Sequence, residues 1–163
     1  MACDSPHPGY RALRRGRCSM VAQPYLVTTI CRNRHPWFRA FPCAVAVAAV
    51  LHETKLWRDS RLLCWVLMPD HLHVLVELGA SEPLSKLMQR VKAVTARAAN
   101  LASTRQGPIW MTGFHDRALR RHEDARAVAR YVIANPLRAG LADSIGDYPY
   151  WDAAWIVDSS ITI

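Results

Sequence analysis

Two histidines separated by one apolar residue, His71-Leu72-His73, are the residues of this chain best suited to chemistry. They follow Pro69-Asp70, a tight-turn signal inside a long apolar run, so the local pattern is typical of strand, turn, strand. Side chains alternate along a strand, which places both imidazoles on one face of a sheet. We therefore expect His71 and His73 to be able to share one metal ion.

A tyrosine and an asparagine one helical turn apart form the second candidate group. Apolar side chains at 125, 128, 129, 132 and 133 predict a helix with a buried stripe, and Tyr131 lies more than about 100° from its centre. Asn135 projects near Tyr131 and precedes Pro136, so the helix is expected to end there with the amide exposed. The pattern therefore predicts that Tyr131 presents its hydroxyl to solvent and that the Asn135 amide is free to bind a ligand. A structural asparagine before a proline turn would give the same pattern at Asn135.

The elements that must position these residues follow from the periodicity. Strands are expected over residues 23–32, 62–68, 71–78 and 109–119, and helices over 41–57, 82–101 and from 122 onward. Ser81 is expected to cap the helix at 82–101. This order predicts an α+β fold, a ferredoxin-like sandwich with an antiparallel sheet, helices packed on one face, and a C-terminal helix that carries Tyr131.

The composition is that of a basic globular domain. The 163 residues carry a formal net charge of +8 at pH 7, which favours a polyanionic partner, although solvated arginines would give the same excess. We expect a basic flexible arm over residues 1–20, one folded domain over 21–157 and a tail over 158–163. On the helix at 82–101, Lys86, Arg90 and Arg97 share a face that is either an ordinary solvated flank or a phosphate-tracking stripe.

Several function classes are disfavoured by the sequence. The longest apolar run is too short to cross a bilayer, the first residues lack the apolar core of a secretion signal, and the cysteines are not spaced as pairs. A cytoplasmic protein without a membrane partner is therefore expected. No glycine-rich phosphate loop is present in the sequence, so we expect no nucleotide cofactor.

Three segments together resemble the REP-associated tyrosine transposases, a group within the single-tyrosine, His-hydrophobic-His superfamily of DNA-nicking enzymes. The segments are MPDHLHVLV at 68–76, GPIWMTGFHDR at 107–117 and RYVIANPLRAGL at 130–141. The resemblance covers roughly residues 10 to 155 and includes a basic segment near the start. It implies a bacterial, nucleoid-associated transposase that acts on single-stranded or hairpin DNA of REP elements.

The resemblance also implies a role for each candidate residue. Tyr131 would attack a phosphodiester in single-stranded DNA and form a 5'-phosphotyrosine linkage. His71 and His73 would bind Mg²⁺ or Mn²⁺ as a Lewis acid, with Asn135 as the third protein ligand. The DNA contacts expected from basic and aromatic side chains are Arg14, Arg15, Arg17, Lys86, Arg90, Trp110, Arg117 and Arg138. For Trp110, packing in the core is an equally good interpretation.

Three questions stay open on the sequence alone. The first is the class of protein. The His pair would also suit a structural zinc in a non-catalytic module that binds structured DNA or RNA. In a metal-dependent nuclease, water would attack the DNA and Tyr131 would have no role. Asp70 stands where many relatives have Asn, and its carboxylate is expected either to bond a ligand histidine or to shape the turn. A monomer with its site in one chain is favoured over a homodimer that exchanges the tyrosine helix.

Overall fold

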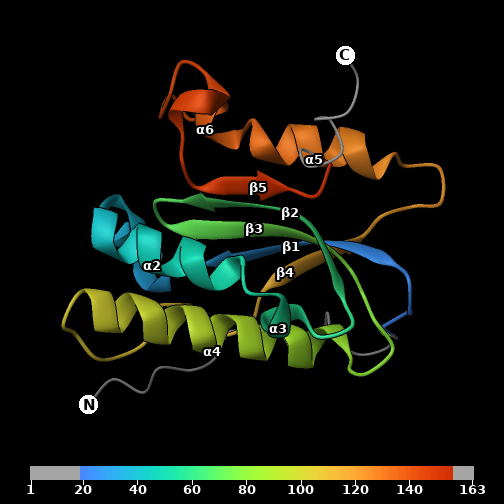
Figure 1. Cartoon of the computed structure of the whole chain (residues 1–163), viewed down its shortest axis with the longest axis horizontal. Coiled ribbons are helices and arrows are strands. Elements are labelled where there is room, and N and C mark those ends of the chain that lie inside the picture. Colours follow the sequence, from blue (N-terminus) through green and yellow to red (C-terminus); the bar gives the residue numbers. More distant parts are fainter. Residues whose placement is uncertain (1–18, 156–163) are drawn as a thin grey trace.

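The computed structural model describes residues 19–155. No helix in that range combines the length and apolarity needed to span a membrane. The elements follow one another as β1 (Pro24–Ile30), η1 (Arg32–Arg34), η2 (Trp37–Arg39), α2 (Phe41–Leu51), α3 (Thr54–Trp57), β2 (Arg61–Met68), β3 (His71–Glu77), α4 (Leu84–Ala102), β4 (His115–Ala118), α5 (Ala125–Ile133), α6 (Asn135–Arg138), η3 (Ile145–Asp147) and β5 (Trp151–Ala153). Figure 1 shows how they are layered.

A five-stranded antiparallel sheet forms the middle layer, with the strand order β4-β1-β3-β2-β5. β2 and β3 make the expected hairpin across the turn at Pro69-Asp70. β3 is the central strand, hydrogen-bonded to β1 on one side and to β2 on the other. A central strand has no free edge, so the two histidines at its start lie on well-fixed backbone.

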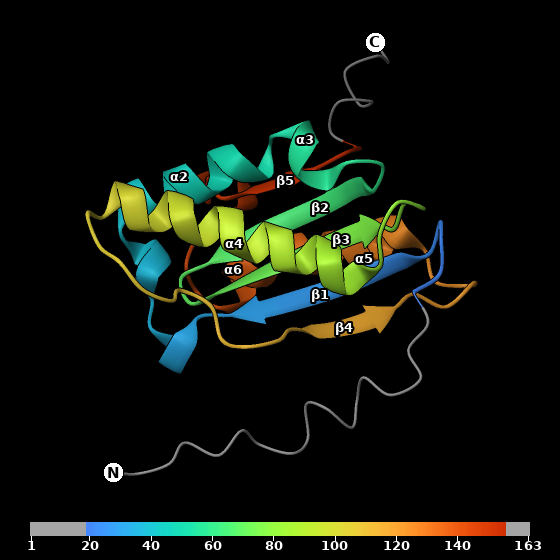
Figure 2. The same ribbon diagram turned by 90° about the horizontal axis from the view of Figure 1, so that it is seen from below.

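Helices cover both faces of this sheet (Figures 1 and 2). Side chains such as Val27, Leu72 and Val74 pack with α2 and α4 in the core of one face, which we call the α2/α4 core. Val66 and Leu75 pack with α5 on the other face, in what we call the α5 core. The α+β fold with an antiparallel sheet is thus confirmed. The helices α2 and α4 share one face as expected, and the C-terminal helix α5 lies on the opposite one.

Two local predictions were wrong. Ser81 does not cap α4, which begins at Leu84 after Pro83, because the backbone N–H and the hydroxyl of Ser81 both donate to the Asp59 carboxylate. The fourth strand is also shorter than expected, since β4 begins only at His115. The preceding segment instead leaves the sheet after an isolated bridge between Cys31 and Trp110, and it packs against α4.

Candidate metal and tyrosine site

His71 and His73 lie side by side at the start of β3, on the face that α5 covers. Leu72 between them points the other way and is buried in the α2/α4 core. The two imidazole centroids are 4.8 Å apart with their planes nearly perpendicular, at 88°. The expected common face is therefore confirmed.

Each imidazole is held through its Nδ1 atom. The Thr28 hydroxyl lies 2.8 Å from Nδ1 of His73, and the Asp70 carboxylate lies 2.5 Å from Nδ1 of His71. Arg34 donates to the other oxygen of Asp70 at 3.1 Å. In metal sites, partners on one ring nitrogen fix the tautomer and orient the other nitrogen toward the metal. Both rings therefore keep Nε2 for a ligand.

The charge state of these groups suits a metal ligand. Burial, with smaller contributions from His71 and Arg138, lowers the pKa of His73 to about 4. His73 is consequently neutral at physiological pH, the form in which imidazole binds metals. Burial acts to raise the pKa of Asp70, but the hydrogen bonds and charges of His71 and Arg34 hold it below its ordinary value. The ring-orienting carboxylate is therefore ionised.

Thr28 and Arg34 are site residues that the sequence alone did not reveal. Thr28 pairs with His73 in the register of β1 against β3, which the local pattern of either strand does not specify. On the edge strand β4, His115 faces Thr28 in register, so His115, Thr28 and His73 form a row across one face of the sheet. The β-rich composition of residues 23–32 was the only available signal for Thr28.

Tyr131 is exposed, as its angular position on α5 predicts: 65% of its surface is accessible. The Arg138 guanidinium lies 3.9 Å from the centroid of its ring and donates to the Tyr131 carbonyl oxygen at 2.7 Å. The charge of Arg138 also reaches His73, where it contributes to the lowered pKa. Arg138 therefore lies against the tyrosine ring and within electrostatic reach of His73.

Asn135 differs from the expectation of a free amide at a helix end. The helix α5 ends at Ile133, and Asn135 begins the short helix α6 because Pro136 fits the first turn of a new helix. The side chain is half-buried, and its Oδ1 accepts a hydrogen bond from Arg138. The amide oxygen has a second lone pair, which Arg138 leaves open to a metal ion.

The donor atoms fit a divalent ion that accepts both nitrogen and oxygen ligands. No group of three His, Cys, Asp or Glu side chains that could hold a metal occurs between residues 19 and 155. Two imidazoles with one amide oxygen would leave positions for phosphate oxygens, and Mn²⁺ tolerates such a mixed set better than Mg²⁺, which prefers oxygen. The imidazoles of His71 and His73 and the amide oxygen of Asn135 suit such an ion by their chemistry.

Not all of the predicted DNA contacts gather at this site. Arg117 and Arg138 lie on the α5 side of the sheet, whereas Lys86 and Arg90 lie on α4, across the sheet from the histidines. Arg90 is bound to Glu82 and to the Leu56 carbonyl oxygen, so it acts as a structural residue. The predicted contacts Arg14, Arg15 and Arg17 lie outside the described residues.

Trp110 is a core residue, and the expectation that it stacks on bases is wrong. Its side chain is only 7% exposed and packs on the ring of Phe38, 5.2 Å away between centroids. Its Nε1 donates to the buried hydroxyl of Thr95 at 3.0 Å. Large aromatics usually pack when a polar partner is within reach, and Thr95 on α4 is that partner.

The site thus combines a histidine pair on the central strand of the sheet with an exposed tyrosine on the helix that covers the same face. Sequence comparison identifies the family. The family described as "Transposase IS200 like" matches residues 20–135, well over half of the chain. This chain belongs to the IS200-like transposase family.

One curated relative and one solved structure carry REP-associated names. The REP-associated tyrosine transposase of Escherichia coli (strain K12) is 26% identical over 99 residues, a match that covers 60% of this chain and 57% of that protein. The chain thus spans little more than half the length of this curated relative. The sequence-based resemblance to the REP-associated tyrosine transposases is confirmed.

Two solved structures share the fold. A REP-associated tyrosine transposase bound to a REP hairpin superposes with a TM-score of 0.65 and 21% identity, covering 90% of this chain and 86% of that one. A crystal structure of a protein from Deinococcus radiodurans R1 that is described as a transposase gives a TM-score of 0.52 and 19% identity, covering 75% and 96%. At these identities the likeness concerns the fold alone.

Proposed function

We propose that this chain cleaves and rejoins single-stranded DNA beside a palindromic, REP-type hairpin, with Tyr131 as the nucleophile and Mg²⁺ or Mn²⁺ held by His71 and His73. The observation that carries the proposal is the pair of imidazoles, each oriented through Nδ1, on the sheet face over which α5 presents an exposed tyrosine. The names of the E. coli relative and of the hairpin-bound neighbour support the choice of substrate.

In the proposed reaction, the Tyr131 oxygen bonds to phosphorus while the bond from phosphorus to the 3'-oxygen breaks. The phenol loses a proton and the 3'-oxygen gains one, which leaves a 5'-phosphotyrosine and a free 3'-hydroxyl. The number of phosphoester bonds is unchanged, so the reverse step can rejoin DNA without ATP. A bound divalent ion would supply Lewis-acid stabilisation of the reacting phosphate.

The chain's own residues position the reactants. Thr28 and Asp70 fix the two imidazoles, and neutral His73 avoids repelling a cation. Arg138 lies against the Tyr131 ring, where its planar guanidinium can donate hydrogen bonds to phosphate oxygens as the DNA arrives. A phosphate that engages Arg138 would compete with the Asn135 amide for its N–H groups and so leave both lone pairs of the Asn135 oxygen open to the ion.

A covalent-adduct assay tests this function. Labelled hairpin DNA with single-stranded flanks is incubated with the protein and Mn²⁺, and the products are separated on a denaturing gel. We expect a slow-migrating labelled band that disappears with Tyr131→Phe and with His71→Ala. Tyr150→Phe is the matched control, since Tyr150 is half-buried against Tyr148 and its hydroxyl loss should leave the band intact. Cleavage without an adduct would replace this mechanism by attack of water.

The bond between Arg138 and Asn135 favours one competing function, a binding module that recognises structured DNA without cutting it. In that case the amide is held permanently by Arg138, and the His pair serves a structural ion such as Zn²⁺. The module would bind the hairpin with wild-type affinity after Tyr131→Phe and after Tyr150→Phe, and the wild-type chain would yield no adduct under any metal. Adduct formation by the wild-type chain excludes it.

We also propose that the site operates within one chain, because α5 covers the sheet face that carries His71 and His73 in the same protomer, and Arg138, which lies against the Tyr131 ring, is within electrostatic reach of His73. Mixing Tyr131→Phe protein with His71→Ala protein tests this directly. A site within one chain gives no adduct in the mixture. Exchange of α5 between two chains would restore one intact site and hence the labelled band.

A further inference from the structure

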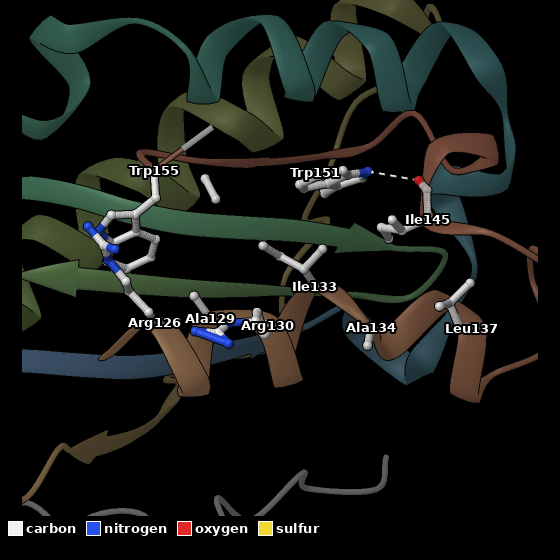
Figure 3. A pocket seen from close by; sticks show the side chains of 10 residues that line it. Arg126, Ala129, Arg130, Ile133, Ala134, Leu137, Ile145, Trp151 and Trp155 are labelled. Atoms are coloured by element: carbon white, nitrogen blue, oxygen red, sulfur yellow. Dashed lines mark hydrogen bonds between the residues drawn. The ribbon is translucent and has the colours of Figure 1, made fainter. Parts of the chain in front are cut away.

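A second hollow lies beside α5, on the flank away from Tyr131. This pocket has a volume of about 460 Å³ and opens between α5 and β5, as Figure 3 shows. Ile133 lines it, and Ile133 and Tyr131 project about 160° apart at roughly 100° per residue. The pocket is therefore distinct from the histidine site, although both adjoin the same helix.

The walls of the pocket combine flat aromatic surface with positive charge. Trp151 and Trp155 provide the indoles, and Trp151 is fixed by a hydrogen bond from its Nε1 to the Ile145 carbonyl oxygen at 3.1 Å. Arg126 lies with its guanidinium carbon 5.8 Å from the Trp155 ring centroid, and Arg130 follows one helical turn later (Figure 3). The described residues that line the pocket include no carboxylate. Its chemistry thus matches a planar base joined to an anion.

We propose that this pocket binds one unpaired nucleotide of the DNA, with the base against Trp151 and Trp155 and the phosphate against Arg126 and Arg130. The inference rests on the proposed function, because it places a subsite for the single-stranded flank next to the helix that carries the nucleophile. The volume is within the ordinary range for small-ligand pockets, about 300–1,000 Å³. Base stacking on aromatic side chains and arginine pairing with phosphate are the interactions that single-strand binders use.

The charge at the rim of the pocket favours a nucleotide over a peptide or a neutral metabolite. Arg126 and Arg130 are exposed on consecutive turns of α5, where they would repel one another without an anion between them. Their charge lies at the rim of an otherwise apolar pocket. A strand that leaves the scissile phosphate at Tyr131 has only to cross α5 to reach this rim. The site would therefore read the flank and not the hairpin stem.

Binding measurements in EDTA with the Tyr131→Phe chain separate this subsite from catalysis. The probes are two fluorescent hairpins with the same stem, one blunt and one with a four-nucleotide single-stranded flank. The variants are Trp155→Ala and the double change Arg126→Gln with Arg130→Gln. The matched control for charge is Arg39→Gln with Lys55→Gln, two exposed cations on the other side of the sheet.

We expect each pocket variant to weaken binding of the flanked hairpin about 10-fold relative to the control and to leave the blunt hairpin unchanged. A 2-aminopurine placed in the flank should be quenched by the protein and recover its fluorescence with Trp155→Ala. Equal losses for both hairpins, or no loss beyond the control, would overturn the proposal. These outcomes do not depend on adduct formation, so a failure of the tyrosine mechanism and a failure of the subsite are distinguishable. Circular-dichroism melts verify that each variant is folded.

Discussion

Replacing Thr28 by valine should weaken metal binding without unfolding the protein. The change exchanges a hydroxyl for a methyl of similar size and removes the oxygen that lies 2.8 Å from Nδ1 of His73. Without that partner the His73 ring is free to rotate and to adopt the other tautomer. Loss of such an orienting partner typically costs 10- to 100-fold in metal affinity, or about 1.4 to 3 kcal/mol.

The adjacent residue provides a matched control. Thr29 points to the other face, is 1% exposed, and its hydroxyl has no hydrogen-bond partner among the described residues. Thr29→Val makes the same chemical change and removes an unsatisfied buried hydroxyl, so it should leave metal affinity unchanged and raise the free energy of unfolding by about 1 kcal/mol.

Titration of the DNA-free protein with Mn²⁺, followed by calorimetry or by the electron paramagnetic resonance signal of free Mn²⁺, measures the effect. Thr28→Val should shift the dissociation constant at least 10-fold, and Thr28→Ser should recover most of the affinity. The reasoning is refuted if Thr28→Val binds Mn²⁺ like the wild type, or if Thr29→Val loses as much affinity. A DNA-free titration is decisive because it does not depend on turnover.

Three further predictions concern stability. Trp110→Phe breaks a buried hydrogen bond and should lower the free energy of unfolding by about 1–3 kcal/mol. Hairpin affinity, measured by fluorescence anisotropy, should stay at the wild-type value. Unchanged stability with weaker hairpin binding would instead make Trp110 a DNA contact. Arg90→Gln leaves Glu82, whose side chain is 8% exposed, without its main partner. The free energy of unfolding, measured by urea denaturation, should fall by up to about 3 kcal/mol. Lys86→Gln should lower it by less than about 0.5 kcal/mol. In EDTA, the free energy of unfolding should fall by at most about 3 kcal/mol as the pH drops from about 6.5 to about 4. The reason is that folding lowers the pKa of His73, so the unfolded state binds more protons than the folded state in this range. His73→Asn should flatten this pH dependence, and an equally steep curve in that variant would contradict the assignment.

The parts of the site that depend on one element were predictable from the sequence. Alternation along a strand was enough to place His71 and His73 on one face, and helical periodicity was enough to expose Tyr131. Both rules concern angles within a single segment, which the chain specifies locally. The apolar run at 62–68 likewise agrees with a strand that is buried on both faces and so needs a helix on each side.

The parts that depend on how elements meet were not predictable. Thr28 reaches His73 only through the register of β1 against β3, and Trp110 is buried because Thr95 on α4 offers it a hydrogen bond. Arg90 looked like a surface cation until Glu82 and the Leu56 carbonyl oxygen were found to bind it. In each case a partner far away in the sequence decides whether a polar group is free, and a single sequence does not name that partner.

The two cores on either side of the sheet divide the protein into regions with different freedom to diverge. The larger α2/α4 core includes neither histidine of the pair nor Tyr131, while the α5 core supports the helix between the tyrosine and the tryptophan pocket. Substitutions around β5 and the outer turns of α5 can therefore accumulate without loosening the scaffold beneath the histidines. Such a partition would let a lineage acquire a new DNA target by altering one side of the molecule, while the opposite side preserves its ability to fold.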